Sequence, residues 1–233
     1  MRFIKFVLVN GGRGNQYFAA LEALTLSRSG YLVIVVLGVS KSRPDTNGRL
    51  LLPEVINFLR RENIPVLPER FNVFSWMMTK LGLIENRWND PSFYRNHMLP
   101  NLKLFVQRFR FFSVIPSCRR FKVTHLRGYR ECNTSRANAE KYNESALAQL
   151  ADVMVTDSPS ELTNRRWCSE IKINPRVGFG LCEDEDDFLT CASAKKLIVI
   201  SSTFSWWAAI LGEVPNVLVV DSEYRVNYPM DVG

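Results

Sequence analysis

Leu197-Ile-Val-Ile-Ser-Ser-Thr-Phe-Ser-Trp-Trp-Ala-Ala-Ile-Leu211 is the stretch that decides the fold. Its first four residues are apolar and mostly β-branched, which is typical of a strand buried on both faces of a parallel sheet. Hydroxyl side chains follow at once, and a hydroxyl just before a helix can accept hydrogen bonds from unpaired first-turn N–H groups. The remaining apolar residues continue as a helix that Gly212 closes. The stretch therefore predicts a strand, a hydroxyl-rich turn and a helix N-terminus.

Such a junction can bind a ligand or simply connect two elements. In an open α/β sheet, ligands bind at the carboxyl ends of the strands, and a helix N-terminus there favours an anion such as phosphate. An ordinary polar turn that caps its own helix would contain the same residue types. The stretch by itself leaves both interpretations open.

The composition is that of a globular protein without membrane spans. The chain has 233 residues, 46% of them hydrophobic and 23% charged, which suits one large α/β domain or two small ones. It contains no apolar run of about 18 residues, the length that would span a membrane, and residues 3–9 are better interpreted as a strand than as a signal peptide. Five cysteines without a CxxC pair argue against structural zinc and a disulfide framework. We therefore expect a cytoplasmic protein.

The start of the chain has the pattern of a strand–helix–strand unit. We expect a strand at residues 3–9, a tight turn at 10–16, a helix at 17–29 and a second buried strand at 31–37. Another helix is expected at 53–63.

The second half is predicted to contain four strands, each followed by a polar turn. The strands are expected at 121–124, 153–155, 197–200 and 217–220, and the helices at 139–150, 160–167 and 183–194. A boundary near residue 117 then divides the chain into two α/β halves, 1–117 and 118–233.

Positive charge is concentrated in one part of the sequence. The net charge is +7, and no acid lies between residues 103 and 130. The basic residues of this segment are Lys103, Arg108, Arg110, Arg119, Arg120, Lys122, Arg127 and Arg130. A basic face can bind nucleic acid, anionic lipid or a phosphorylated small molecule. No nucleic-acid recognition motif accompanies the charge, so we expect no nucleic-acid partner and retain peripheral contact with a membrane.

Polar side chains follow several predicted strands. His125 and Arg127 are two residues apart on an extended segment, so both project to the same side. A guanidinium can hold a diphosphate through two parallel hydrogen bonds, which a lysine cannot reproduce. Asp157 could accept hydrogen bonds from a base or a ribose, and the glycines at 12 and 14 would let backbone approach a ligand closely.

A dinucleotide-binding motif does not fit the first turn. Tyr17 stands where the third glycine of Gly12-x-Gly14 belongs, and the second strand ends without the acid that would hold a ribose.

Together, the turns resemble glycosyltransferase family 11, the α-1,2-fucosyltransferases. The matching motifs occur in the order seen in that family: Gly11-Gly-Arg-Gly-Asn-Gln16, His125-Leu-Arg127, Thr156-Asp-Ser-Pro159 and Ser201-Ser-Thr-Phe-Ser-Trp-Trp207. The resemblance implies a GT-B-like fold, with two Rossmann-like halves facing a cleft. It also implies an inverting transfer of L-fucose from GDP-fucose to a glycan hydroxyl, such as the 2-OH of galactose in a lipid-linked polysaccharide precursor. Residues 38–117 contribute almost nothing to it.

The resemblance further implies roles for individual residues. Arg127 would stabilise the charge on the leaving diphosphate, and Asn15 would lie near the acceptor hydroxyl; no general base is assigned. The residues implied to bind substrate are Gly12, Gly14, His125, Asp157, Ser158, Ser202, Thr203, Phe204 and Ser205. No metal or cofactor is expected. Asp184 and Asp186 are interpreted as acids that favour a helix start through the helix dipole.

The chain departs from the family in three of these motifs. Arg13 stands where the family usually has Leu, Ser201 replaces Asn, and Gly128-Tyr-Arg130 follows Arg127 in place of Arg-Gly-Asp. These departures leave a second hypothesis open, in which a catalytically degenerate module binds a nucleotide sugar without transferring it.

Overall fold

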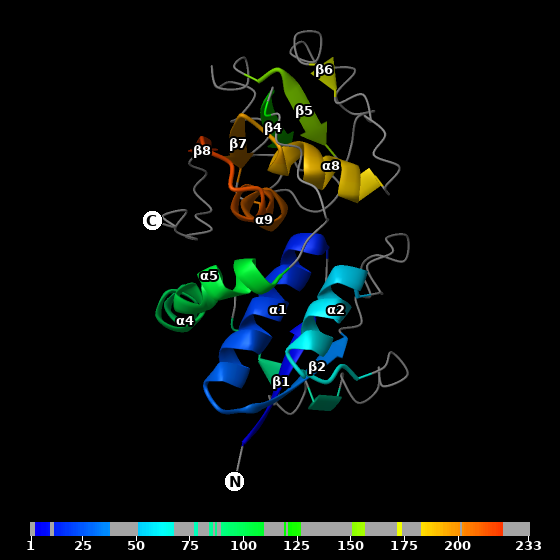
Figure 1. The fold of residues 1–233 in the computed structure, drawn as a ribbon, viewed down its shortest axis with the longest axis vertical. Helices are drawn as coiled ribbons and strands as arrows, with labels where there is room; N and C mark the ends of the chain where they lie inside the picture. The colour runs from blue at the N-terminus through cyan, green and yellow to red at the C-terminus, as the bar shows by residue number, and fades with distance from the viewer. Residues whose placement is uncertain are drawn as a thin grey trace. The chain divides into compact units, whose positions relative to one another are not determined.

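The structure is a computed structural model of the chain. It describes residues 3–9, 12–37, 51–67, 77–78, 84–85, 87, 90–109, 119, 121–126, 151–156, 172–173, 183–200 and 202–220. The chain divides into two compact units, Met1–Phe111 and Phe112–Gly233. Each unit contains a parallel sheet with helices, so the α/β class expected from the sequence is confirmed (Figure 1).

The first unit is built on a sheet with the strand order β2-β1-β3. Its strands are β1 (Ile4–Val9), β2 (Leu32–Leu37) and β3 (Ile84–Glu85), and β1 pairs in parallel with both neighbours. The helix α1 (Arg13–Arg28) connects β1 to β2 and packs against both strands. Its sequence Tyr17–Leu26 is buried throughout, because a helix that covers a sheet and is itself covered by other helices has little surface left for water.

Further helices pack against α1. They are α2 (Pro53–Arg61), the π-helical turn η3 (Tyr94–Met98) and α5 (Leu99–Arg108), while the short α4 (Pro91–Phe93) contacts η3. Aromatic rings join these elements: the Phe58 and Phe105 ring centroids are 4.8 Å apart, and so are those of Tyr17 and Phe109. Phe93, Tyr94, Phe105 and Phe109 are buried and therefore belong to the core of this unit.

One expectation for the first unit is wrong. We expected a turn at residues 10–16, but α1 already begins at Arg13, with Gly12 as its N-cap. Gly12 has φ −76° and ψ −179°, an extended conformation open to any residue, and Gly14 lies inside the first helical turn. Glycine is well tolerated at an N-cap, so these glycines mark the start of a helix and not a long loop.

The second unit has a five-stranded sheet with the order β6-β5-β4-β7-β8. The strands are β4 (Lys122–Leu126), β5 (Val153–Thr156), β6 (Lys172–Ile173), β7 (Lys196–Ile200) and β8 (Val217–Val220). The helix α8 (Glu183–Ala192) precedes β7, and α9 (Thr203–Leu211) connects β7 to β8. From β4 the chain adds strands on one side and then returns to the other side with β7. The strand order therefore reverses between β4 and β7, which is where doubly wound sheets bind ligands.

The helices α8 and α9 approach closely at their carboxyl ends. A Cβ atom on Gly212 would lie 2.2 Å from the Ala192 carbonyl oxygen, so only glycine fits there. The Arg119 guanidinium donates hydrogen bonds to the carbonyls of Ala192, Ala194 and Gly212, which are left over where the two helices end. Arg119 thus caps the C-termini of α8 and α9.

Two of the positive charges at residues 103–130 are engaged by other groups of the chain, which the sequence did not indicate. Arg108 forms an ion pair with Glu62, with Nη1 2.7 Å from Oε2, so an acid distant in sequence does offset one of its charges. Arg119 is engaged with carbonyl groups. Arg127 and Arg130 lie outside the described residues.

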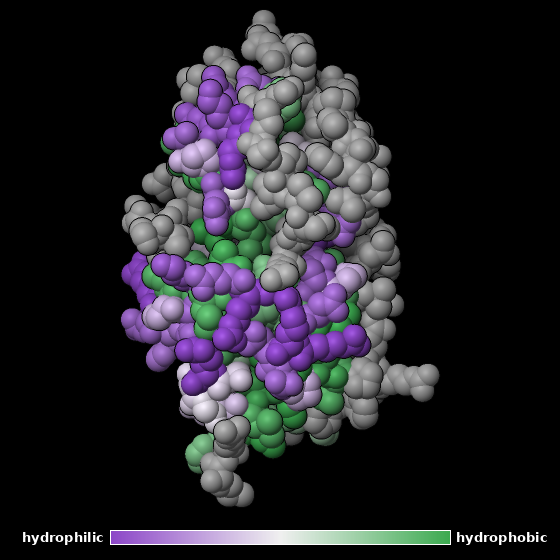
Figure 2. Space-filling model, in the orientation of Figure 1, coloured by the Kyte–Doolittle hydropathy of each residue, from purple (hydrophilic) through white to green (hydrophobic). Residues whose placement is uncertain are grey.

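The described surface mixes hydrophilic and hydrophobic residues (Figure 2). Its large exposed apolar side chains are Phe3, Ile4, Leu32, Met77 and Phe121. No helix in the described part of the chain is long and apolar enough to cross a membrane. The helices expected at 139–150 and 160–167 lie outside the described residues.

Candidate functional site

The candidate site lies at the carboxyl end of the second sheet, where β4 and β7 are neighbours. His125 on β4 is in register with Val155 of β5 and Val199 of β7, so a strand flanks it on each side. The first residue of α9 follows the end of β7 after only Ser201 and Ser202. The short connection brings the N-terminus of α9 to the same edge of the sheet as His125.

The imidazole of His125 is fixed by two residues of α9. Its Nδ1 lies 2.6 Å from the Ser205 Oγ, and its ring centroid lies 4.9 Å from that of Phe204, with 31° between the planes. Phe204 in turn meets Phe188 of α8 edge-on, at 5.2 Å and 88°. His125 is 7% exposed and Ser205 is fully buried. These contacts with α9, and of α9 with α8, therefore restrain the ring of His125.

Ser202 is the N-cap of α9 but does not cap it with its side chain. Its φ of −132° and ψ of 125° are extended, and its carbonyl accepts the first helical hydrogen bond from the Trp206 amide at 3.0 Å. Only 4% of Ser202 is exposed, and within the described residues its Oγ has no hydrogen-bond partner. Leaving a buried hydroxyl unsatisfied costs about 1–3 kcal/mol, which a ligand with a suitable oxygen would offset.

The electrostatics of this turn favour an anion. The first amides of a helix have no partner within the helix, and the helix dipole places positive partial charge at them. The first turn of α9 contains no acidic residue. Two hydroxyls and an imidazole accompany those amides, so the turn is rich in groups that can donate hydrogen bonds to phosphate oxygens.

The structure brings together the implied residues His125, Ser202, Thr203, Phe204 and Ser205. Ser205 differs from the rest, because its hydroxyl is used on His125 and it is fully buried. The implied residues Arg127, Asp157 and Ser158 lie outside the described residues. The structure gives no position for those three side chains.

The implied residues Gly12, Gly14 and Asn15 belong to the first unit, at the start of α1. Gly12 is exposed and a Cβ there would meet nothing within 4 Å, whereas Gly14 is buried and Asn15 half-buried. Their immediate neighbour Arg13 is 4% exposed, although the sequence singled it out only as a departure from the family.

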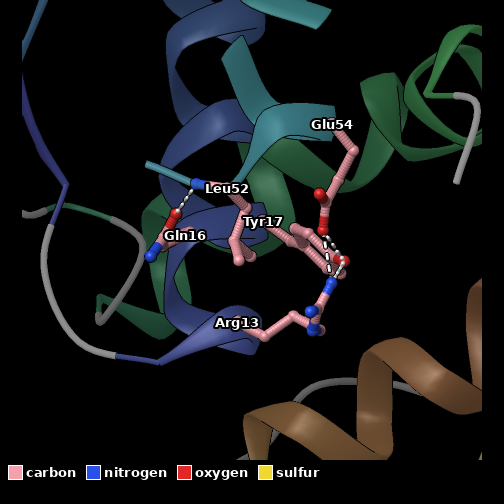
Figure 3. A network of polar contacts seen from close by, with 5 residues as sticks. All are labelled: Arg13, Gln16, Tyr17, Leu52 and Glu54. Carbon is pink, nitrogen blue, oxygen red and sulfur yellow. Dashed lines mark hydrogen bonds and ion pairs between the residues drawn. The ribbon is translucent and has the colours of Figure 1, made fainter. Parts of the chain in front are cut away.

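Arg13 belongs to a buried polar network with α2 (Figure 3). Its Nη1 donates to the Tyr17 hydroxyl at 3.0 Å and forms an ion pair with Glu54. The Tyr17 hydroxyl donates to the Glu54 Oε1 at 2.9 Å, which closes a ring of three side chains. The amide of Leu52 donates to the Gln16 Oε1 at 2.9 Å. The first turn of α1 is thus tied to the start of α2.

The hydroxyl of Tyr17 stays neutral in this network. Burial raises the pKa of Tyr17 well above its usual value, and the adjacent Arg13 only partly opposes that effect. Sequence reasoning missed the network because Arg13 and Glu54 are 41 positions apart and carry no shared motif.

The acidic residues singled out in the sequence stand at the start of α8. Asp184 and Asp186 both lie in its first turn, as expected for acids at a helix N-terminus. Asp186 is 7% exposed, and its Oδ1 has no hydrogen-bond partner within the described part of the chain. Among the described residues, no group of three His, Cys, Asp or Glu side chains could hold a metal ion.

Comparison with known proteins adds no relative. No protein-family model matches the chain, and neither curated proteins nor solved structures gave a match. The function has to be inferred from the residues and geometry of the chain itself.

Proposed function

We propose that the chain is an inverting fucosyltransferase that binds GDP-fucose at the carboxyl edge of the second sheet. The observation that carries the proposal is the N-terminus of α9, where the buried Ser202 hydroxyl has no partner among the described residues. This turn lies beside His125, at the point where the strand order reverses. An anion with several oxygens, such as a diphosphate, matches these donors. The Ser201–Trp207 motif that resembles the fucosyltransferases contains the same turn.

The proposed reaction is a displacement at the anomeric carbon of fucose. An oxygen of the acceptor forms the new bond to that carbon, the bond to the diphosphate oxygen breaks, and the proton of the acceptor hydroxyl passes to a general base, a role to which no residue is assigned. Negative charge accumulates on the departing GDP. The α9 amides, His125 and Arg127 would stabilise that charge, a contribution usually worth several kcal/mol in barrier height. The reaction as proposed needs no metal or cofactor.

We further propose that the two units form a GT-B-like pair, in which the first unit approaches the acceptor. Asn15, at the start of α1, would then lie near the acceptor hydroxyl. The acceptor would be a glycan, in the family's manner the 2-OH of a galactose on a lipid-linked precursor at the cytoplasmic side of a membrane.

Thermal shift with a panel of nucleotides tests the donor. The panel is GDP, GDP-fucose, GDP-mannose and UDP-galactose, each with and without EDTA. A ligand that binds only the folded state raises the Tm by mass action. We expect GDP and GDP-fucose to stabilise the protein, UDP-galactose to have no effect, and EDTA to change neither result. Absence of a shift with every nucleotide would contradict the proposal.

Transfer separates an enzyme from a binding module. We expect transfer of fucose to a galactose-terminated acceptor, and near-complete loss of it in Arg127→Lys with the Tm unchanged, because lysine cannot make the paired hydrogen bonds. Stabilisation by GDP-fucose without transfer or hydrolysis over a broad acceptor panel would instead identify a degenerate nucleotide-sugar-binding module.

A further inference from the structure

An exposed apolar patch lies at the end of the first unit where its strands begin. Phe3, Ile4 and Leu32 are 74%, 51% and 44% exposed. The Leu32 amide donates a hydrogen bond to the Phe3 carbonyl at 3.0 Å, and Leu32 is in register with Ile4. The three residues are therefore neighbours on adjoining strands. Single exposed apolar residues are ordinary, whereas a contiguous group of them indicates a contact surface.

The same end of the unit carries positive charge. The helices α1 and α2 run against the direction of the strands, so both helices finish where the strands begin (Figure 1). Their last turns contain Arg28, Arg60 and Arg61, all of them exposed. Among the side chains that the structure describes at this end, the acid is Glu62, and it is paired with Arg108. The described surface here is therefore cationic as well as apolar.

Helix dipoles explain only part of this arrangement. A cation in the last turn of a helix is favourable, because the carboxyl end of a helix bears negative partial charge. That effect accounts for the arginines at the ends of α1 and α2. It does not account for large apolar side chains left in water at the same end. A surface that combines the two is suited to an anionic membrane, where cations meet the lipid headgroups and apolar side chains enter the interface.

We propose that this end of the first unit binds the surface of a membrane that contains anionic lipid. The membrane-binding end consists of the apolar Phe3, Ile4 and Leu32 and the basic Arg28, Arg60 and Arg61. Such contact requires neither a spanning helix nor a bound nucleotide. It goes beyond the proposed function, although a lipid-linked acceptor would be found at the same surface.

A second copy of the chain fits this end less well than a membrane does. In a twofold dimer the same patch faces itself, so the arginines of one copy would be brought against those of the other. Like charges placed together across an interface are unfavourable. An anionic leaflet has the opposite charge and can cover the apolar side chains at the same time.

Sedimentation with vesicles tests the proposal. The full chain, without nucleotide, is mixed with vesicles of equal parts phosphatidylcholine and phosphatidylglycerol, or of phosphatidylcholine alone. We expect binding to the anionic vesicles and little binding to the neutral ones. Added salt should weaken the binding, because it screens exposed charges. A chain that stays in solution with both kinds of vesicle would overturn the proposal.

Two double variants locate the contact on the first unit. Phe3→Ser/Leu32→Ser removes apolar surface, and Arg60→Gln/Arg61→Gln removes two charges without adding a poor helix former. Because all four side chains are exposed, both variants should keep the Tm. We expect each to bind anionic vesicles about tenfold more weakly or less tightly still. Unchanged vesicle binding in both variants would overturn the proposal.

The second unit supplies matched controls at the start of β4. Phe121 is 53% exposed, the Lys195 amide donates to its carbonyl at 2.8 Å, and Lys122 and Lys195 are exposed. Phe121→Ser matches the apolar variant, and Lys122→Gln/Lys195→Gln matches the loss of two charges. We expect both controls to bind vesicles like the natural protein. Equal losses in the controls and in the first-unit variants would overturn the assignment to the first unit.

Sedimentation velocity and thermal shift separate the remaining outcomes. A natural protein that dimerises, with Phe3→Ser/Leu32→Ser monomeric, would make the patch an interface between copies and overturn the membrane contact. Vesicle binding by a protein that no nucleotide stabilises would support the membrane contact and contradict the proposed function. Stabilisation by GDP without vesicle binding would do the reverse.

Discussion

The two units contain the same kind of junction, a strand that leads into a helix N-terminus. They differ in the partners of the polar groups at that N-terminus. In both, the N-cap is extended and, as far as the structure describes the chain, makes no side-chain cap hydrogen bond: Gly12 for α1 and Ser202 for α9. The first junction is closed by the chain itself, through Arg13, Tyr17 and Glu54 (Figure 3). The second has a buried hydroxyl without a partner in the described residues.

The difference lies in the charge that each junction can accept. A cation in the first turn of a helix is unfavourable with respect to the helix dipole, so Arg13 requires the nearby carboxylate of Glu54. In that pair the positive charge of Arg13 is offset within the chain by a carboxylate. The described residues of the second junction contribute hydroxyls, amides and an imidazole, and the first turn of α9 contains no acidic residue. The same local architecture therefore serves internal packing in one unit and is suited to a ligand in the other.

Removal of Glu54 should break the closed junction. In Glu54→Ala the Arg13 guanidinium, whose side chain is 1% exposed, is left buried without its carboxylate. We expect a loss of about 3–5 kcal/mol in the free energy of unfolding. Urea denaturation measures it.

Two variants show whether the loss reflects burial of a charge. Arg13→Leu/Tyr17→Phe/Glu54→Leu removes all three polar partners of the network and should be close to the natural protein in stability, because apolar side chains can replace a buried ion pair at little cost. Glu62→Ala breaks the Arg108–Glu62 pair, in which Arg108 is 47% exposed, and should cost no more than about 1 kcal/mol. If Glu54→Ala were as mild as Glu62→Ala, the first junction would not be held by its buried charges.

The local parts of this comparison could be predicted from the sequence, and the long-range parts could not. The strand, the hydroxyl-rich turn and the helix of residues 197–211 depend on neighbouring residues, and they appear as β7 and α9. The contact between His125 and Ser205 joins residues 80 positions apart, and that between Arg13 and Glu54 joins residues 41 apart. Such pairs arise from strand order and helix packing, which no local pattern encodes. The glycines at 12 and 14 misled for a related reason, since they suit a loop and a helix start equally well.

Ser202→Ala tests the open junction and should separate stability from binding. The Ser202 Oγ has no hydrogen-bond partner among the described residues, so its removal should leave the Tm of the ligand-free protein unchanged or slightly raised. A hydrogen bond to a charged group is worth about 1.5–3 kcal/mol, so GDP should bind about tenfold or more weakly. Thermal shift against GDP concentration measures both. A large loss of Tm without GDP would mean that the hydroxyl supports the fold and that the two junctions do not differ.

Tyr17 gives the closed junction a pH dependence of known sign. Its pKa is raised in the folded state, chiefly by burial, above the usual value of 10.0 that it regains on unfolding. The neutral hydroxyl therefore contributes its full stability below about pH 10, and this contribution is lost as the pH rises from there toward the folded-state pKa. Tyr17→Phe should be less stable at neutral pH by about 1–3 kcal/mol, because Arg13 and Glu54 each lose a partner. It should also lose stability less steeply than the natural protein between pH 9 and pH 11, measured as Tm. An equal slope in both proteins would mean that the pKa of Tyr17 is the same in the folded and the unfolded state.

Gly12→Ser makes the smallest change and tests whether the first junction is closed to ligands. The backbone at Gly12 is already extended, and a Cβ there would meet nothing within 4 Å, so serine can enter without strain. Its hydroxyl could accept a hydrogen bond from the amide of Gly14 or Asn15, and the gain over glycine should be a few tenths of a kcal/mol. The stability of the GDP complex should rise by the same small amount, because a cap in the first unit adds nothing to and removes nothing from a nucleotide held by α9. If the serine instead reduced the shift in Tm that GDP produces, the amides at the start of α1 would be part of the nucleotide site. The contrast between a closed junction and an open one would then have to be replaced by a site to which both helix N-termini contribute.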